Sequence, residues 1–396
     1  MALVLSLNSG SSSCKVQLFD MPSEKVICNG LFERIGLDEG LIKVKFENNE
    51  IKKSQPLKTH HEAINIFFAI LQDEKIISSI NDVKAVGHRI VHGGEKYAKS
   101  VVINDEVAQD IDKYSELAPL HNPANLLGYT VIKELLPDVL QVAVFDTAFH
   151  QTLKPETYMY PIPYHYYDKY KIRKYGFHGT SHFYVSDTLR KTIGEDKTEK
   201  IITCHLGNGA SLSAIKHGQC INTSMGYTPL AGIMMGTRSG DIDPAILPFI
   251  QQAENLTPDE TLEIFNRESG LKGISEISSD MRDIKAAVDN NNTKAKLALN
   301  MYIHRIGSTI ASYIAQLGGC DAIIFTAGVG ENATFVREMV LNYLQPAFAI
   351  NVDTNKNNQR GDFFEITKQD SSIKAYVIAT NEELMIARDA YSFYSI

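Results

Sequence analysis

Three short segments rich in glycine, asparagine and serine have the composition of phosphate-binding turns. They are residues 8–13, 207–211 and 328–332, and each follows an apolar run typical of a buried strand. Glycine lets the backbone approach an anion closely, and successive N–H groups with hydroxyl or amide side chains can surround phosphate oxygens. One such segment is usually only a turn. Three in one chain favour a phosphate-bearing ligand.

Five isolated polar residues are the candidates for chemistry. A guanidinium is suited to bidentate binding of carboxylate or phosphate, so Arg89 and Arg238 are candidate anion ligands, although each could equally form a structural ion pair. Asp146 directly follows an apolar run, where α/β folds place active residues and where turn aspartates are equally common. His178 and Glu382 have equally plain alternatives, a buried structural histidine and a first-turn helical glutamate.

Two oxygen-bearing side chains suggest a metal. Asn8 and Glu382 would suit Mg²⁺, which prefers oxygen ligands, keeps several waters and takes few protein groups.

Other nucleotide and metal motifs fit poorly. There is no GxxxxGK[ST] segment, which excludes the P-loop mechanism. Gly328, Gly330 and Ala333 match a loose dinucleotide fingerprint, but no clear acidic residue follows about 20 positions later. The pairs His88/His92 and His178/His182 lack the glutamate of HExxH. Glycines at positions 93, 94 and 179 also argue against long helices there, so zinc catalysis is disfavoured.

Composition limits the class of protein. A chain of 396 residues predicts two to three domains, and 44% hydrophobic with 22% charged residues is typical of globular chains. The net charge of −8, without a block of like charge, argues against a nucleic-acid partner. Five scattered cysteines without a CxxC pair indicate a reducing cytoplasm. Neither a signal peptide nor a membrane span of about 18 apolar residues is expected.

The hydrophobic pattern predicts an α/β fold. Strands are expected at residues 3–7, 142–145, 201–204 and 322–325, and helical spacing occupies residues 63–71, 297–317 and 384–391.

An internal similarity suggests a duplication. Residues 7–12 and 206–211 each follow an apolar run and precede an alternating segment, so each predicts a hairpin. Two similar domains facing each other across a cleft are therefore expected. We place them at residues 1–150 and 151–381, with a final helix at 382–396 that starts from a capping box at 380–383 and packs back on the first domain.

One segment is rich in proline and tyrosine. Residues 155–163 form the natural boundary, and the six tyrosines within residues 158–170 are expected to form an interdomain or subunit contact rather than to stack on bases.

Eight motifs spread over almost the whole chain resemble those of the acetate kinase family. They are Leu7-Asn8-Ser9-Gly10-Ser11-Ser12-Ser13, His88-Arg89-Ile90-Val91-His92-Gly93-Gly94, Val144-Phe145-Asp146-Thr147-Ala148-Phe149-His150, Tyr175-Gly176-Phe177-His178-Gly179-Thr180-Ser181-His182, His205-Leu206-Gly207-Asn208-Gly209-Ala210-Ser211, residues 234–244, Thr326-Ala327-Gly328-Val329-Gly330-Glu331-Asn332 and Thr380-Asn381-Glu382-Glu383-Leu384.

The resemblance implies a two-domain, ribonuclease H-like fold of the actin and sugar-kinase superfamily and a cytoplasmic homodimer. It also implies reversible transfer of the γ-phosphoryl group of ATP to acetate, giving acetyl phosphate and ADP, with Mg²⁺ or, in its place, Mn²⁺. No nucleic acid or membrane is expected as a partner.

The resemblance also assigns roles by motif. Asp146, His178 and Arg238 are implied to be catalytic, and Asn8 and Glu382 to hold the metal. Arg89 is implied to bind the acetate carboxylate, and the methyl pocket is assigned to Val91, Leu120, Phe177 and Pro229. The implied nucleotide contacts are Lys15, His205, Leu206, Gly207, Asn208, Gly209, Asp280, Met281, Arg282, Gly328, Val329, Gly330, Glu331 and Asn332.

Two residues depart from the family pattern. Cys14 replaces a branched aliphatic residue, and Ala231 stands where a glutamate is common, which affects the loop that presents Pro229 and Arg238. Three other functions stay open: a propionate or other short-chain acyl kinase, a sugar kinase with Asp146 as base, and an actin-like ATPase switch.

Overall fold

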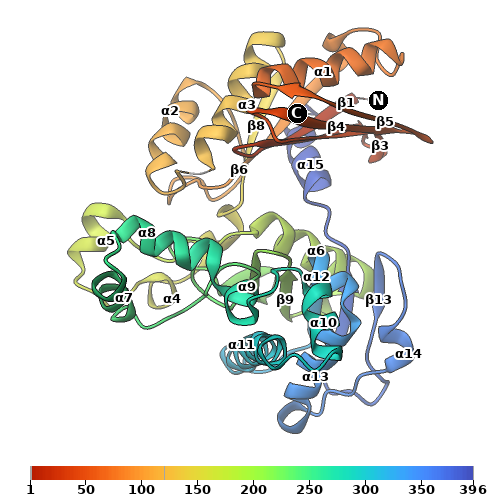
Figure 1. Ribbon diagram of the computed structural model, residues 1–396. Helices are drawn as coiled ribbons and strands as arrows, with labels where there is room; N and C mark the ends of the chain where they lie inside the picture. Colours follow the sequence, from red (N-terminus) through yellow and green to blue (C-terminus); the bar gives the residue numbers. More distant parts are fainter. Residues whose placement is uncertain (1, 120, 396) are drawn as a thin grey trace. The chain divides into compact units, whose positions relative to one another are not determined.

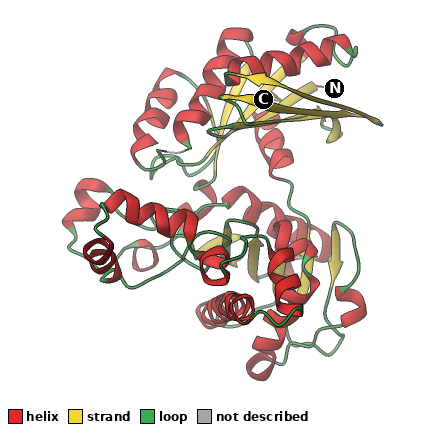
Figure 2. Cartoon of the chain, viewed as in Figure 1, coloured by secondary structure: helices red, strands yellow, loops and turns green. Residues whose placement is uncertain are grey.

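The computed structural model describes residues 2–119 and 121–395, and the chain divides into two compact units. The first unit comprises Met1–Phe149 and Asn381–Ile396, and the second comprises His150–Thr380. The division falls before the segment rich in proline and tyrosine, which lies inside the second unit. Both units mix helices and strands, which confirms the predicted α/β class (Figure 2).

The first unit is built on an eight-stranded sheet in the order β5-β4-β3-β2-β1-β6-β8-β7. The first five strands form an antiparallel meander, whereas β6 and β8 run parallel to β1. The strands are β1 (Ala2–Ser9), β2 (Ser13–Met21), β3 (Lys25–Glu33), β4 (Leu37–Phe46), β5 (Asn49–Leu57), β6 (Val83–Ile90), β7 (Val101–Val102) and β8 (Leu140–Phe145). The helices are α1 (His60–Asp73), α2 (Asp105–Lys113), α3 (Asn122–Leu135) and α15 (Glu382–Tyr394).

Helices cover both faces of this sheet. Leu5 and Leu7 of β1 share a buried core with Phe67 of α1 and Ile132 of α3. The opposite face receives α15, which lies so close that a Cβ on Gly87 of β6 would lie 2.5 Å from the side chain of Ile386. Alternate residues of β1 and β6 therefore point toward α3 and toward α15.

The second unit is built on a six-stranded sheet in the order β11-β10-β9-β12-β14-β13. Its strands are β9 (Lys200–Leu206), β10 (Ala210–Lys216), β11 (Gln219–Thr223), β12 (Ala322–Thr326), β13 (Phe363–Glu365) and β14 (Lys374–Ile378). Its helices include α4 (Pro155–Tyr158), α5 (His165–Tyr170), α6 (Gly179–Ile193), α7 (Ile246–Glu254), α8 (Pro258–Glu263), α9 (Gly270–Ser275), α10 (Met281–Asp289), α11 (Thr293–Leu317), α12 (Ala327–Asn332), α13 (Thr334–Phe348) and α14 (Thr354–Asn357) (Figure 1).

The two sheets share one arrangement of five strands. The order β3-β2-β1-β6-β8 in the first unit matches β11-β10-β9-β12-β14 in the second. In both, the first three strands are antiparallel and the last two run parallel to the central strand. Both predicted hairpins are present, as β1-β2 and β9-β10. The carboxyl ends of the central parallel strands are the places where such folds bind ligands.

Three local expectations were wrong. Gly179 does not prevent a helix, because it is the first residue of the 15-residue α6, whose buried Val185 and Leu189 outweigh one glycine at the end. Residues 327–332 form the short helix α12 rather than an open turn, and the Glu331 carboxylate accepts from the N–H of Ala327 at 2.8 Å. The last helix is capped by Asn381, not by the residue before it, because the Asn381 side chain accepts from the N–H of Leu384.

Among the described residues, every helix is too short or too polar to cross a lipid bilayer.

Candidate active site

The first unit gathers charge at the carboxyl ends of three neighbouring strands. Asn8 lies near the end of β1, Arg89 near the end of β6, and Asp146 directly after β8. The Nε of Arg89 donates to Asp146 Oδ1 and Oδ2 at 3.2 and 3.1 Å, and its Nη2 donates to Oδ2 at 2.5 Å. Its Nη1 donates to Asn8 Oδ1 at 3.4 Å. The structure therefore brings these three predicted residues together.

Burial and charge fix the ionisation of this cluster. The Asp146 carboxylate is 1% exposed, and Arg89 is its ion-pair partner. Burial alone would lower the pKa of Arg89, but Asp146, together with Glu382 and Glu383, outweighs burial and raises the pKa above its ordinary value. Arg89 is therefore a permanent cation that is held in place by a carboxylate.

Glu382, in the first turn of α15, lies near this ion pair. Burial raises its pKa to about 7; Arg89 opposes this shift, whereas Asp146 and Glu383 add to it. The neighbouring Glu383 forms an ion pair with Lys15 of β2. Lys15, a predicted ATP contact, is thus an exposed side chain of the first unit.

The donor set fits a hard divalent cation. Asn8 and Glu382 offer an amide oxygen and a carboxylate that is costly to ionise without a nearby cation. No group of three or more acidic, histidine or cysteine side chains gathers around a common point in the described part of the chain. Such a sparse set suits Mg²⁺, which is usually held by one or two protein groups, waters and substrate phosphates.

Two buried asparagines of α3 hold the loops of this site, and sequence analysis did not find them. Asn125 accepts from the N–H of Val91 at 3.0 Å and donates to the carbonyl of Ser9 at 2.7 Å. Asn122 accepts from the N–H of His92 at 3.0 Å. Their positions three residues apart at the start of an amphipathic helix were the available signal.

In the second unit, His178 lies beside the β9-β10 turn. Its backbone is left-handed, with φ of 56°, immediately before α6 begins. Its Nδ1 lies 2.9 Å from Ser211 Oγ, and its ring stacks on that of His205 with centroids 4.1 Å apart. Ser211 also bonds His182 Nε2 at 2.7 Å. Burial lowers the pKa of His182 well below its ordinary value, and His150 and His205 add to that effect.

Arg238 reaches the same turn from a long loop. A Cβ on Gly209 would lie 3.2 Å from Arg238 Nη1 and 3.6 Å from the His178 ring. Arg238 donates weakly to the carbonyl of Pro229 at 3.5 Å, and no carboxylate pairs with it among the described residues. Burial lowers its pKa from the ordinary value. Two predicted catalytic donors thus converge on one glycine of the turn.

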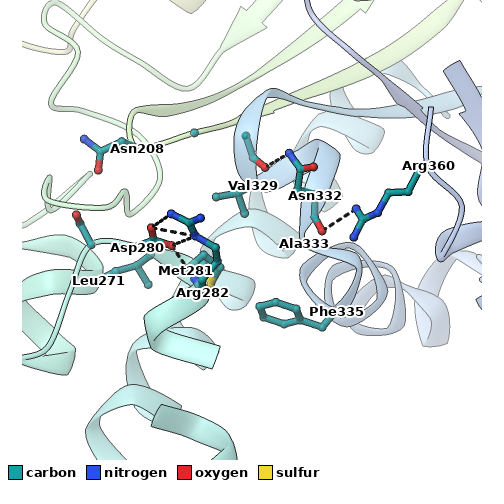
Figure 3. A pocket seen from close by; sticks show the side chains of 13 residues that line it. Asn208, Leu271, Asp280, Met281, Arg282, Val329, Asn332, Ala333, Phe335 and Arg360 are labelled. Carbon is teal, nitrogen blue, oxygen red and sulfur yellow. Dashed lines mark hydrogen bonds and ion pairs between the residues drawn. The ribbon is translucent and has the colours of Figure 1, made fainter. Parts of the chain in front are cut away.

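A cavity of about 720 Å³ opens beside this turn (Figure 3). Its walls come from the β9-β10 turn and from α10, α12 and α13. Eight of the predicted nucleotide contacts line it: Gly207, Asn208, Asp280, Met281, Arg282, Gly328, Val329 and Asn332. The Asp280 carboxylate is bound by Arg282, whose Nη2 donates to Oδ2 at 2.5 Å. The cavity has the size of a small-molecule site.

Five other predicted contacts of this unit are not among the residues that line the cavity. They are His205, Leu206, Gly209, Gly330 and Glu331. Leu206 is fully buried. The Glu331 carboxylate accepts from the N–H groups of Ala327 and Thr380 at 2.8 and 3.2 Å, so it ties α12 to the end of β14.

Sequence analysis missed three residues around the cavity. Phe335 and Arg360 line it. Arg337 is fully buried and donates to the carbonyls of Gly330 and Glu331 at 2.9 and 2.8 Å, and to the Asn357 side chain at 2.8 Å. These hydrogen bonds fix the position of the last residues of α12. A lone arginine among apolar helical residues was the only signal.

Comparisons with known proteins identify the family of the chain. The model of the acetokinase family matches residues 3–388. The chain belongs to the acetokinase family. An acetate kinase of Clostridium botulinum is 52% identical over 98% of both chains, and an acetate kinase 2 of Listeria monocytogenes is 48% identical over 98% of both.

Solved acetokinase structures match over the same length. An acetate kinase of Porphyromonas gingivalis has a TM-score of 0.93 and 42% identity, covering 99% of both chains. A propionate kinase of Francisella tularensis also has a TM-score of 0.93, with 38% identity over 99% of this chain and 100% of that one. The two-domain fold is therefore that of the acetokinase family.

Within this acetokinase, the predicted methyl-pocket residues are divided between the units. Val91 and Phe177 are buried, and Pro229 is half-buried. Val91 belongs to the first unit, and the other two belong to the second. Leu120 lies outside the described residues.

The two departures from the family pattern lie in the first and the second unit, respectively. Cys14 is fully buried, and burial raises its pKa to about 12, so its thiol is unreactive. Ala231 packs close to Gly226, where an added Cβ would lie 3.0 Å from the alanine methyl group.

Proposed function

We propose that this acetokinase catalyses the reversible, Mg²⁺-dependent transfer of the γ-phosphoryl group of ATP to acetate, giving acetyl phosphate and ADP. The observation that best supports the proposal is the convergence of Arg238 and His178 on Gly209, in a turn that also lines the cavity. Preorganised donors beside a phosphate-type turn suit the charge that develops in phosphoryl transfer.

The acceptor needs orientation rather than deprotonation. Acetate is already ionised at pH 7, so a general base has no proton to remove. In the proposal Arg89 binds the acetate carboxylate with N–H groups that it does not give to Asp146. Asp146 holds the guanidinium in position and is a positioning residue. Arg89 and Asp146 belong to the first unit, and the cavity belongs to the second.

The transfer itself is a direct in-line displacement. An acetate oxygen forms a bond to the γ-phosphorus while the bond from that phosphorus to the β,γ-bridging oxygen breaks, and the bridging oxygen leaves on ADP. Arg238 and His178 donate to the equatorial oxygens, where charge is spread in the transition state. Losing one such donor typically costs about 10²–10³ in turnover.

Asn8 and Glu382 are the residues we assign to Mg²⁺, with Mn²⁺ as a substitute. When bound, the cation would neutralise part of the charge on the outer phosphates of ATP.

The test is a hydroxylamine trap for acyl phosphate. The purified chain is incubated with Mg-ATP and, separately, acetate, propionate, butyrate or glycerol, and hydroxamate and ADP are measured. Hydroxamate from acetate with the highest kcat/KM is expected. The same assay with an excess of EDTA should give none, and added Mn²⁺ should restore part of the rate.

Other results would replace the proposal. A higher kcat/KM for propionate would make the enzyme a propionate kinase with the same mechanism, since one methylene in an apolar pocket changes kcat/KM by only about 10–200-fold. ADP release without hydroxamate from any acid would favour an ATPase switch. Phosphorylation of glycerol would favour a hydroxyl acceptor with Asp146 as base.

We also infer that the enzyme is a cytoplasmic homodimer that pairs through the second unit. Large apolar side chains are exposed on α5, α7 and the segment before α5, including Tyr164 at 67% and Phe249 at 71%. Exposed apolar groups that gather in this way are typical of subunit contacts. Sedimentation should give twice the mass of the chain, and Phe249→Glu should lower it to that of a monomer; an unchanged dimer would place the contact elsewhere.

A further inference from the structure

A buried polar layer lies between α6 and the β9-β10 hairpin of the second unit. On the sheet side, Thr203 of β9 and Ser211 of β10 are fully buried. On the helix side, His182 of α6 is fully buried as well. Apolar side chains would fill this space without the cost of removing hydroxyl and imidazole groups from water. A polar layer whose members are all hydrogen-bonded fixes their orientation instead.

Three hydrogen bonds join this layer to His178 in a single chain. Thr203 Oγ1 lies 2.7 Å from His182 Nδ1, and His182 Nε2 lies 2.7 Å from Ser211 Oγ. Ser211 Oγ in turn lies 2.9 Å from His178 Nδ1. A neutral imidazole carries one N–H, and the partner of one ring nitrogen decides which nitrogen carries it. The direction of the hydrogen bonds along this chain therefore determines the tautomer of His178.

The buried end of the chain sets that direction. Burial, with smaller contributions from His150 and His205, holds the pKa of His182 well below its ordinary value, so this ring is neutral near pH 7 and has one N–H. Among the described residues, the Thr203 hydroxyl bonds only to His182. If His182 Nδ1 carried the proton, the hydroxyl hydrogen of Thr203 would be buried without an acceptor, which is costly. Thr203 therefore donates to Nδ1, and His182 donates from Nε2 to Ser211.

The same direction extends to His178. Because Ser211 Oγ accepts from His182, its own hydrogen is donated to His178 Nδ1, and the proton of neutral His178 is then on Nε2. This nitrogen faces the β9-β10 turn, since a Cβ on Gly209 would lie 3.6 Å from it. The same Cβ would lie 3.2 Å from Arg238 Nη1. The N–H of His178 and the guanidinium thus converge on one point of the turn.

We propose that Ser211, His182 and Thr203 are positioning residues that hold neutral His178 in the tautomer with its proton on Nε2, which makes it a donor to the transferring phosphoryl group. The inference rests on the proposed function, because it states how one donor of that site is prepared. A neutral donor also suits the neighbouring His205 ring, whose centroid is 4.1 Å away, since two imidazolium rings at that distance would repel each other.

The tautomer is measured directly by ¹⁵N NMR of the full chain, labelled in its histidine rings, at pH 8 and without nucleotide. The chain has 12 histidines, and His178→Gln identifies the signals of His178 by their loss. We expect one signal typical of a bare Nδ1 and one typical of a protonated Nε2. A proton on Nδ1 with a bare Nε2, or a doubly protonated ring at this pH, would overturn the proposal.

Kinetics in the acyl-phosphate assay test what the hydrogen bond to His178 contributes. Ser211→Ala should lower kcat by about 10–100-fold, the range found when the partner that orients a metal-bound histidine is removed. The KM for ATP should change little, because the lost bond acts on the donor and not on the lining of the cavity. The matched control is Ser213→Ala, which removes another fully buried hydroxyl of β10 that donates to Thr223 rather than to a histidine. Its kcat should stay close to that of the wild type.

The far end of the chain allows a test without any change beside His178. Thr203→Val keeps the shape of the side chain but removes the hydrogen that sets the direction, so the NMR signals of His178 should become those of a mixture of tautomers. kcat should then fall by about twofold, as expected when two states are equally populated. Thr203→Ser keeps the hydroxyl and should show the wild-type signals and the wild-type kcat.

An unchanged kcat in Ser211→Ala, or an unchanged tautomer in Thr203→Val, would overturn the proposal. An equal loss of kcat in Ser211→Ala and Ser213→Ala would also overturn it, because the effect would then belong to the packing of β10. If the melting temperature shows that Ser211→Ala is unfolded, the NMR of the wild type and of the two Thr203 variants decides. Absence of acyl phosphate with the wild type would instead overturn the proposed function, which the tautomer measurement does not depend on.

Discussion

The two units of this acetokinase use the same edge of the same kind of sheet in opposite ways. At the carboxyl ends of β1, β6 and β8, a partly buried arginine is bound to a buried carboxylate. At the equivalent ends of β9, β12 and β14, the Glu331 carboxylate is bound by backbone N–H groups, the other polar groups include hydroxyl and imidazole groups, and Arg238 has no carboxylate partner among the described residues. In the first unit the guanidinium of Arg89 is bound to a carboxylate of the same unit, whereas in the second unit the guanidinium of Arg238 has N–H groups to offer a ligand.

Because of this difference, substitutions in the two units should affect stability and activity differently. Removing the arginine of such a pair leaves a buried carboxylate uncompensated, which is costly to the fold. Removing an arginine with no carboxylate partner costs the fold little, but it removes charge that the reaction needs. The following predictions test the distinction.

The largest effect is expected for Arg238→Ala. Turnover in the acyl-phosphate assay should fall by about 10²–10³, because a donor to the transferring phosphoryl group is lost. The midpoint of urea unfolding should stay within experimental error of the wild type. Near-normal turnover would show that Arg238 does not stabilise the transition state.

Arg89→Ala should lower both the stability of the fold and the activity. Asp146 would be left buried without its partner, so the free energy of unfolding should fall by about 3–5 kcal/mol, and acyl-phosphate formation should be lost. Urea unfolding measures the first effect. The double variant Arg89→Ala with Asp146→Ala should regain part of the stability but none of the activity; if it is less stable than the single variant, the ion pair is not the cause.

Acid should weaken the fold through buried histidines. Burial, opposed by the hydrogen bond that His88 Nε2 donates to Gln141 Oε1, lowers the pKa of His88 to about 4. Because the unfolded chain binds the proton more readily, stability is complete above about pH 6.5 and is lost as the pH falls toward 4; at pH 5 the loss amounts to about 2 kcal/mol.

Urea unfolding of the wild type and of His88→Asn at pH 7 and pH 5 measures this loss of stability in acid. The variant should lose less stability between the two pH values than the wild type does. His61→Gln, which changes an exposed histidine, should keep the full loss. Equal losses in all three proteins would assign the acid sensitivity to other groups.

Gly209→Ala should have the smallest effect. The added methyl group would lie 3.2 Å from Arg238 Nη1, so the guanidinium must shift by a few tenths of an ångström. Turnover should fall by about tenfold, while the KM for acetate should change little, because small displacements of a catalytic group have large effects on rate. An unchanged turnover would show that the Arg238 guanidinium adapts to the added methyl group without loss of function.

The sequence allowed the class and the principal elements to be predicted because their signals are local. Apolar runs followed by Gly, Asn or Asp marked β1, β8, β9 and β12, and helical spacing marked α1, α11 and α15. The similarity of two glycine-rich hairpins indicated a repeated unit, which the shared strand order confirms.

What the sequence did not reveal depends on contacts between distant residues. Asn125 bonds both Ser9 and Val91, and Arg337 bonds both α12 and Asn357, yet neither residue belongs to a recognisable motif. The helical state of α12 also depends on such a contact, because the Glu331 side chain bonds the start of its own helix. The roles of the site residues stay predictions until the variants are measured.

The position of α15 has a consequence for how the protein is made. The last helix packs on β1, β6 and β8, and it brings Glu382 to the acceptor cluster. All of residues 150–380 are translated between these strands and that helix, which takes on the order of tens of seconds at ordinary elongation rates. Throughout that time the nascent first unit exposes the sheet face that Ile386 later covers. The cluster of Arg89 and Asp146 thus gains Glu382 only after the whole second unit has been translated.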